Sequence, residues 1–199
     1  FNGHTYESIV LGNGQEWMAE NLRTTIYANG DAIPNVTGDD QWYSLTSGAW
    51  CHYGNNNLNE NPYGKLYNWY AVVDPRNVCP SGWHVPTDAE WTVLSDYLGG
   101  ADVAGGKMKT TGTIEAATGV WSAPNGGATN SIGFSGVPGG GRYYYSIASM
   151  IGNGGYWWSS SEDGEYYAWS RYLSFNDGAL TRPSNRNRKS GFSVRCLRN

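Results

Sequence analysis

Polar and apolar residues alternate over residues 4–11, and a second short segment, 15–22, follows directly after Gly12-Asn13-Gly14. Alternation with a period of two is typical of a half-buried strand. An Asn-Gly step between two such segments is a strong signal of a β-hairpin, so we expect the two segments to pair. Residues 27–60 are dominated by Gly, Asn and Asp without a clear period, which predicts long loops.

The spacing of apolar residues predicts two short helices. In residues 66–73, Leu, Trp, Tyr and Val recur at helical spacing and predict the first. The second has a clearer start, because Thr87 can cap it and Glu90 completes a capping box. An apolar stripe follows, and Gly99-Gly100 should end this helix. Residues 101–130 are again loop-like, so we expect no further helix.

The last third of the chain predicts short strands. Their residues are rich in Tyr and Trp, which favour strands. Gly139-Gly140-Gly141 is interpreted as a turn that leads into the first strand. In the last strand Phe192, Val194 and Cys196 share one face, which we assign to the core. The expected strands cover residues 142–147, 156–160, 166–175, 179–182 and 192–197.

Composition indicates a loop-rich domain held together by aromatic packing. The 199 residues include 28 Gly, 10 Trp and 15 Tyr but only 4 Phe, and 15% of the residues are charged. This composition argues against long helices. The length suits one domain over residues 1–199, and no linker or internal repeat divides it. Since no apolar run reaches about 18 residues, we expect no direct insertion into a membrane.

The strand expected at residues 166–175 should show one face to each side of a sheet, so about half of its aromatic residues should be exposed. We expect the Trp side chains to be mostly buried, and the Tyr, Ser, Asn and Arg side chains to lie mostly outside. Tyr gives a large contact area at little entropic cost, and Ser and Asn adapt their hydrogen bonds. The C-terminal part of the chain therefore favours a binding function over catalysis.

The charge distribution argues against nucleic acid as a partner. The formal net charge is -4, and affinity for nucleic acid rests on cationic charge. Six of the 13 basic residues nevertheless fall within the last 18 positions, where no acidic residue occurs.

Few residues suit catalysis or metal binding. The three His residues are scattered, and neither an HExxH nor a GxSxG motif occurs. Glu162, Asp163 and Glu165 cluster in one expected loop and Asp177 lies in another, so a structural calcium ion is an alternative to simple solvated loop tips. Their spacing does not follow an ordered calcium-loop pattern, and we expect no cofactor and no metal.

The chain has three cysteines, Cys51, Cys79 and Cys196, without CxxC spacing. One disulfide with one cysteine left over suits an oxidising compartment. Three buried thiols in a reducing compartment are the alternative.

Five ordered motifs carry a resemblance to a known family. They read GQEWMAENL, YGKLYNW, CPSGWHVPT, YWWSSS and GFSVRC, and they begin at Gly14, Tyr63, Cys79, Tyr156 and Gly191. The chain resembles the Fibrobacter succinogenes major paralogous domain family, which is abundant in surface and secreted proteins of Bacteroidota. That family is similar to the C-type-lectin-like and formylglycine-generating-enzyme folds. The resemblance implies an α+β fold with two helices, a small twisted antiparallel sheet and long loops.

The resemblance also implies a disulfide between Cys79 and Cys196, with Cys51 left over. Some relatives are variable proteins of diversity-generating retroelements, in which adenine-containing codons of the C-terminal strands and loops are diversified. The stretches Tyr143-Tyr144-Tyr145, Tyr166-Tyr167 and Asn185-Arg186-Asn187 are compatible with such diversification.

The chain departs from both related folds at the positions that carry their chemistry. The formylglycine-generating enzymes use a pair of cysteines near the C-terminus, whereas Cys196 is alone in that region. Sugar-binding C-type lectins use calcium loops, of which only Phe175-Asn176-Asp177 is faintly similar. Oxidation of a substrate cysteine and calcium-dependent sugar binding are therefore unsupported.

We expect a non-enzymatic ligand-binding domain of an exported protein, extracellular or at a bacterial cell surface, or alternatively on a phage particle. The binding face should lie within residues 142–189, with a protein or peptide as partner rather than a glycan. The alternatives are a calcium-independent glycan-binding module, an enzyme of the sulfatase-modifying or glycan-hydrolysing kind, and a purely structural surface module. The expected contact residues are Tyr143, Tyr145, Tyr166, Tyr167, Arg171, Asn176, Arg182, Asn185 and Asn187.

Overall fold

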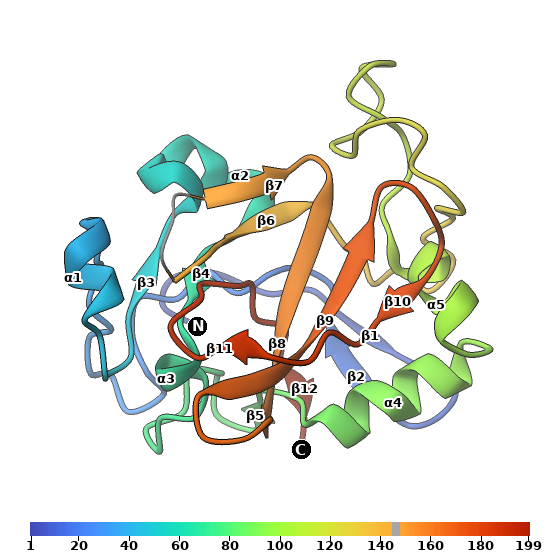
Figure 1. The fold of residues 1–199 in the computed structure, drawn as a ribbon. Helices are drawn as coiled ribbons and strands as arrows, with labels where there is room; N and C mark the ends of the chain where they lie inside the picture. The colour runs from blue at the N-terminus through green and yellow to red at the C-terminus, as the bar shows by residue number, and fades with distance from the viewer. Residues whose placement is uncertain (145–147) are drawn as a thin grey trace.

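The structure, a computed structural model, describes residues 1–144 and 148–199 (Figure 1). Short helices combine with sheets that are mostly antiparallel, which confirms the α+β class. In Figure 1 the large sheet lies between α1 and α2 on one side and α4 and α5 on the other. The described helices are α1 (Asp39–Tyr43), η1 (Tyr53–Asn55), η2 (Asn57–Asn59), α2 (Glu60–Tyr63), α3 (Trp69–Val72), α4 (Asp88–Tyr97) and α5 (Ala101–Met108).

The helix after Thr87 forms as predicted. The hydroxyl of Thr87 accepts a hydrogen bond from the backbone N–H of Glu90, whose carboxylate accepts one from the backbone N–H of Thr87. The helix ends before Gly99 and Gly100, which have φ values of 97° and 98° that favour glycine. In the part of the chain that the structure describes, no helix is long and apolar enough to cross a membrane.

The expectation of only two helices is wrong. The helix expected at residues 66–73 has only the four residues of α3, because Asn68 caps it by accepting a hydrogen bond from Ala71 N. Residues 101–130 were expected to be a loop but contain α5. Its Gly105 and Gly106 lower helix propensity, and both are needed for packing: a Cβ on Gly105 would clash with the carbonyl of Ala179. Residues 27–60 also contain short elements.

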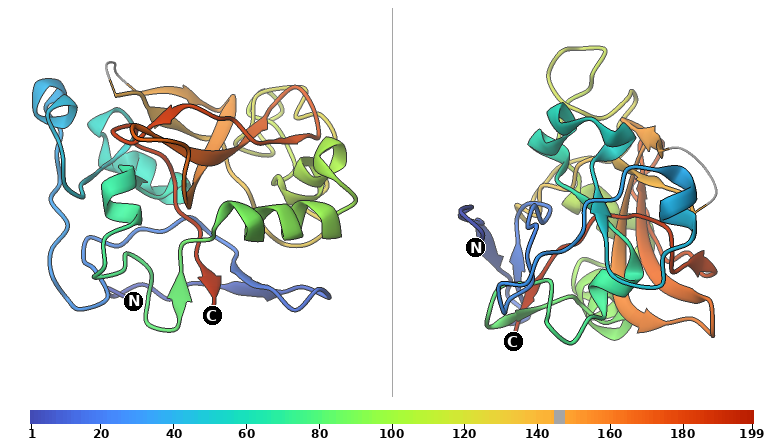
Figure 2. Two further views of the ribbon diagram at one scale, coloured as in Figure 1. Left: turned by 60° about the horizontal axis from the view of Figure 1, so that its bottom comes forward. Right: turned by 90° about the vertical axis from the view of Figure 1, so that its left-hand side faces the viewer.

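A small four-stranded sheet lies on the side of the molecule where both chain ends are found (Figure 2). Its strands are β1 (Ser8–Val10), β2 (Glu16–Met18), β12 (Leu197–Arg198) and β5 (Trp83–His84), in that order. The predicted hairpin is confirmed, with Ile9 opposite Trp17. A separate pair joins β3 (Trp50–Cys51) to β4 (Leu66–Tyr67).

The large sheet has six strands and supports the C-terminal face. The strands expected at 156–160, 166–175 and 179–182 are confirmed, whereas β7 (Ala148–Ile151) and β11 (Arg186–Asn187) were not predicted. The three glycines expected to form a turn belong to strand β6 (Gly139–Arg142). Glycine is needed at Gly140 and Gly141 because a Cβ on either would clash with neighbouring atoms. In order the strands are β10 (Leu180–Thr181), β9 (Tyr167–Ser174), β8 (Gly154–Glu162), β6 (Gly139–Arg142) and β7 (Ala148–Ile151), with β11 (Arg186–Asn187) also paired to β9.

Residues 190–197, here called the central segment, run through the interior and connect the sheets. All eight residues are buried. Phe192 pairs with Tyr67 of β4, and Ser193 pairs with Trp157 of β8. The regular strand expected at 192–197 is therefore replaced by single bridges to several partners, and β12 begins only at Leu197.

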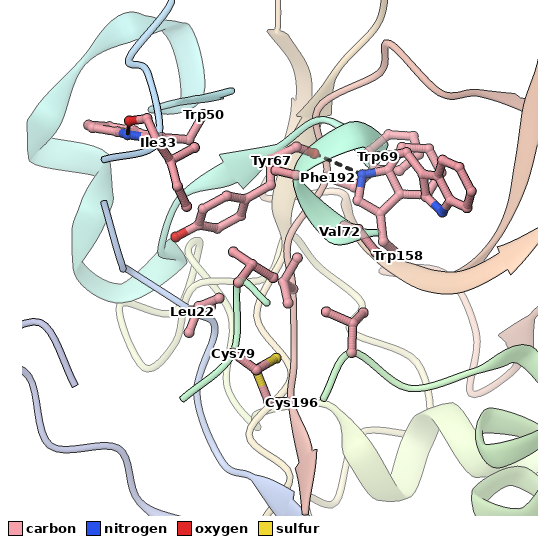
Figure 3. Close-up of a cluster of buried hydrophobic side chains, with 14 of the residues drawn as sticks. Leu22, Ile33, Trp50, Tyr67, Trp69, Val72, Cys79, Trp158, Phe192 and Cys196 are labelled. Atoms are coloured by element: carbon pink, nitrogen blue, oxygen red, sulfur yellow. Dashed lines mark hydrogen bonds between the residues drawn. A yellow bond between two sulfur atoms is a disulfide. The ribbon is translucent and has the colours of Figure 1, made fainter. Parts of the chain in front are cut away.

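The aromatic core lies around the central segment (Figure 3). Adjacent residues of β8 supply two separate clusters: Trp158 packs on Phe192, with ring centroids 4.5 Å apart, and Trp157 packs with Phe134. The predicted burial of Trp is confirmed for eight of the ten, with Trp83 and Trp169 only partly buried. The Cys79–Cys196 disulfide joins the central segment to the chain before α4, and Cys51 is a buried free thiol.

Arginine was expected to lie mostly outside, and three arginines are exceptions. Arg142, Arg171 and Arg195 are buried, each with its guanidinium hydrogen-bonded. Arg195 has no exposed surface; it donates to the side chain of Asn21 and to the backbone carbonyls of Met18, Phe134 and Ser135. A buried charge is tolerated only with such partners.

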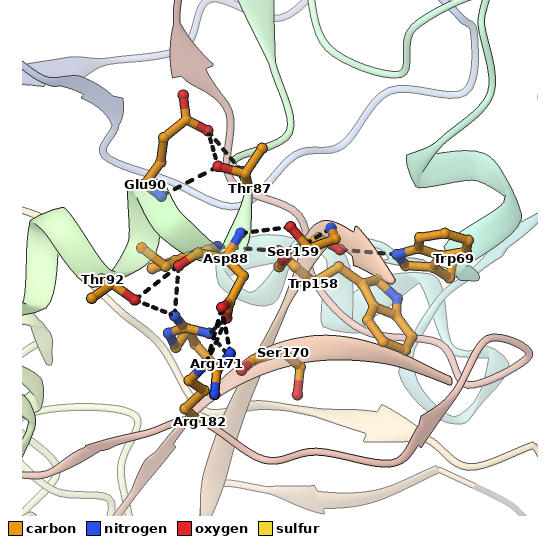
Figure 4. A network of polar contacts seen from close by, with 12 residues as sticks. Trp69, Thr87, Asp88, Glu90, Thr92, Trp158, Ser159, Ser170, Arg171 and Arg182 are labelled. Atoms are coloured by element: carbon orange, nitrogen blue, oxygen red, sulfur yellow. Dashed lines mark hydrogen bonds and ion pairs between the residues drawn. The ribbon is translucent and has the colours of Figure 1, made fainter. Parts of the chain in front are cut away.

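The start of α4 is joined to β9 and to the chain after β10 by one carboxylate (Figure 4). Asp88 accepts a hydrogen bond of 2.7 Å from buried Arg171 and bonds of 2.9, 3.0 and 2.6 Å from Arg182. Burial alone would raise the pKa of Asp88, but the bonds from Arg182 and Arg171 outweigh it and the pKa is lowered.

Replacing both disulfide cysteines, Cys79→Ala with Cys196→Ala, should lower the free energy of unfolding by about 4 kcal/mol. The bond spans 117 residues, so its loss frees a long loop in the unfolded chain. Urea unfolding measures the change. The control Cys51→Ala, which removes a buried thiol but no crosslink, should lose only about 1 kcal/mol. Equal losses in the two variants would contradict the prediction.

Asp88→Asn should lower the free energy of unfolding at pH 7 by about 3 kcal/mol or more, because it leaves Arg171 buried without its ion pair. Asp96→Asn, on an exposed site of the same helix, should change it by less than about 0.5 kcal/mol.

The pH dependence gives a second readout of Asp88. The pKa of Asp88 is lowered in the folded state. Its contribution to the free energy of unfolding is therefore complete at pH values above the ordinary pKa of an aspartate, and it declines as the pH falls. Thermal unfolding should therefore show that the difference in melting temperature between wild type and Asp88→Asn becomes smaller below about pH 4. A gap that is the same at pH 3 and pH 7 would contradict the assignment.

Candidate functional site

A pocket of about 250 Å³ opens where the residues after β6, the start of β9 and the segment around β11 meet. Figure 1 shows β11 beside β9 on the large sheet. Of the described residues, none with an acidic side chain lines this pocket. Its lining consists of aromatic rings, amides, a hydroxyl and one guanidinium: Tyr143, Tyr144, Tyr167, Asn185, Arg186, Asn187 and Ser190.

Backbone pairing fixes the β11 side of the pocket. Arg186 lies opposite Ala168 and Asn187 opposite Tyr167 in an antiparallel pair. Asn185 has a φ of 58°, a left-handed conformation that asparagine tolerates, and its N–H donates to Asp163 over 2.8 Å. The side-chain carbonyl of Asn187 accepts a hydrogen bond from Lys189 N, so this turn leads directly into the central segment.

The tyrosine side of the pocket rests on the core. The Tyr143 and Tyr156 hydroxyls are 3.2 Å apart, and the two rings meet edge to face. Burial first, and then this hydrogen bond, raise the pKa of Tyr156. The ring of Tyr144 stacks on Tyr43, with centroids 6.3 Å apart. Tyr167 is 37% exposed and offers its side chain to solvent.

Basic side chains around the pocket lie over aromatic rings. The guanidinium carbon of Arg188 is 4.4 Å from the ring centroid of Trp69, and that of Arg186 is 5.5 Å from Tyr156. Lys189 Nζ is 4.9 Å from the centroid of Tyr43. Such cation–π contacts hold flexible side chains in place.

The structure brings four of the expected contact residues together in this pocket: Tyr143, Tyr167, Asn185 and Asn187. Tyr166 is 62% exposed beside them but does not line it. Tyr145 lies outside the described residues.

Three other expected contact residues lie elsewhere. Arg171 is 2% exposed and bound to Asp88, so its assignment as a surface contact is wrong: the strand face it occupies packs against α4. Arg182 reaches solvent but binds the same Asp88 and stacks on Trp169 at 3.5 Å. Asn176 is exposed in the turn between β9 and β10.

The sequence reasoning missed Tyr144, Arg186 and Ser190. Tyr144 and Arg186 lie within the Tyr and Asn runs that had already been singled out. The available signal was therefore the runs themselves, because their described members Tyr143, Tyr144, Asn185, Arg186 and Asn187 all line the pocket. Ser190 carried no signal of its own.

Three of the four acidic residues in the expected loops make protein contacts. Glu162 lies 3.2 Å from Arg188, and Asp163 accepts from Asn185 N. The backbone carbonyl of Asp177 accepts a hydrogen bond of 2.8 Å from the buried ammonium of Lys109, which also donates to Gly126 and Ser174. Within residues 1–144 and 148–199, no group of three His, Cys, Asp or Glu side chains is placed to hold a metal ion.

Comparisons with known proteins give a family but no characterised relative. No curated protein and no solved structure matches the chain. The family model of the Fibrobacter succinogenes major domain matches residues 10–198. This match covers nearly the whole chain, and the chain therefore belongs to the Fibrobacter succinogenes major domain family.

Proposed function

We propose that this protein is a non-enzymatic ligand-binding domain of an exported protein, and that it binds a protein or peptide through the pocket beside β11. The observation that carries the proposal is the pocket's lining. Tyrosine rings, asparagine amides and one guanidinium converge there, and these groups are typical of binding surfaces that have evolved for recognition.

The residues beneath the pocket are held in place by ring contacts and hydrogen bonds, which favours binding because little ordering is needed when a ligand arrives. Tyr156, under the pocket, is held between the rings of Tyr172 and Phe192, with centroids 4.5 Å and 4.9 Å away. Arg188 is fixed by Gly164 and Tyr167 carbonyls and by Trp69.

The state of the cysteines supports a binding role over cysteine-based catalysis. Cys196 is bonded to Cys79, and Cys51 is buried. Burial raises the pKa of the Cys51 thiol to about 11, so its reactive thiolate form is scarce at neutral pH.

The disulfide supports a place outside the cytoplasm, since such bonds persist in oxidising compartments. We propose the bacterial cell surface or the extracellular space, with a phage particle as the alternative. We also propose that the α+β arrangement is C-type-lectin-like, and that residues on the pocket's loops are those a diversifying system would change.

Tyr167→Ala should abolish or strongly weaken ligand capture, because it removes an aromatic ring that lines the pocket and is exposed to solvent. The measurement is pull-down from a host or microbial surface proteome, run alongside a glycan array. Aromatic anchors typically contribute 2 kcal/mol or more, so the affinity should fall about 30-fold.

Tyr97→Ala is the matched control, since Tyr97 is 47% exposed on α4 and does not line the pocket. It should leave capture unchanged. If the domain captured only a glycan, the ligand would be a sugar and the proposal of a protein or peptide ligand would be wrong. Loss of capture in both variants, or in neither, would contradict binding at this pocket.

A further inference from the structure

Arg186 differs from the other basic residues of its segment in having no acceptor for its guanidinium. Its Nε atom is shielded from solvent without a hydrogen-bond partner. Its one contact of note is with the face of the Tyr156 ring, and among the described residues it forms no ion pair. A buried donor without a partner destabilises the protein, and an incoming acceptor can remove that cost.

The neighbouring basic residues show how unusual this is. Arg182 is paired with Asp88, and Arg188 with Glu162 and two backbone carbonyls. Lys189 donates to the carbonyl of Tyr43 over 2.6 Å. Of the four basic residues between positions 182 and 189, Arg186 alone has an unsatisfied guanidinium, and it is the one that lines the pocket.

We propose that the pocket takes a single carboxylate group, held by the guanidinium of Arg186. This deepens the proposed function and rests on it. The planar guanidinium matches a carboxylate in shape and can donate two parallel hydrogen bonds to it. One cation among neutral lining groups suits one negative charge, and the amides of Asn185 and Asn187 flank it with further donors.

The source we favour is an acidic side chain of a protein or peptide, not a polyanionic glycan. The loop beside β11 carries Glu162, Asp163 and Glu165, and the chain has a net charge of -4. The repulsion from these carboxylates grows with the number of negative charges on a ligand, so a single carboxylate is repelled least.

The direct test is a titration of the ¹⁵N-labelled protein, following the Arg186 Nε–H resonance, which Arg186→Gln identifies by its disappearance. N-acetylglutamate amide should shift this resonance saturably, and the neutral isostere N-acetylglutamine amide should not. The Arg198 Nε–H resonance, from an exposed arginine paired with Glu16, should stay in place and report any non-specific effect.

Glucuronic acid and inorganic phosphate complete the titration. A stronger response to glucuronic acid than to N-acetylglutamate amide overturns the peptide source in favour of an acidic sugar. A response to phosphate alone, or to none of the four compounds, overturns the carboxylate assignment.

A second measurement separates this inference from the proposed function. For a partner captured by the wild-type domain, Arg186→Gln should weaken binding roughly 10- to 100-fold, the range of a charge-assisted hydrogen bond. Arg198→Gln should leave binding unchanged. If Tyr167→Ala abolishes binding while Arg186→Gln does not alter it, the binding function stands and the carboxylate assignment fails.

Discussion

The burial of residues 190–197 is the constraint on which the rest of the structure depends. This central segment hydrogen-bonds to β4, β6 and β8, and it continues into β12 of the small sheet. Its Phe192 is in the cluster with Trp158, and its Cys196 carries the disulfide. Arg195 donates hydrogen bonds to four oxygens of the interior: the side-chain carbonyl of Asn21 and the backbone carbonyls of Met18, Phe134 and Ser135.

The central segment also holds one side of the pocket in place. β11 ends at Asn187, three residues before the central segment begins, so its backbone is anchored at that end. At its other end Asp163 holds Asn185. The pocket residues around β11 are therefore only a few positions from Asn185, which Asp163 holds, and from the buried central segment. They nevertheless lie on loops, which tolerate changes of side chain.

The sequence predicted those features that depend on interactions between residues close together in the chain. The Asn-Gly hairpin and the Thr87 capping box were found because each depends on residues only a few positions apart. α5 was missed because its two glycines are explained by close approach of Ala179 and Gly127, which lie far away in sequence. The same limit applies to the arginines. Arg171 is bound by Asp88 of another element, and no neighbouring residue in the sequence sets it apart from Arg186, which has no such partner among the described residues. The disulfide pairing came from the family resemblance and not from spacing.

The position of the central segment has a consequence for how the domain is made. Synthesis proceeds from the N-terminus, and domains generally form in that order as the chain emerges. Here the residues that complete the interior are among the last of the domain to leave the ribosome. Until they arrive, Trp158 and Tyr67 lack the ring and backbone partner that Phe192 provides. The cluster around Trp158 and Tyr67 therefore stays incomplete in the nascent domain until the central segment has emerged.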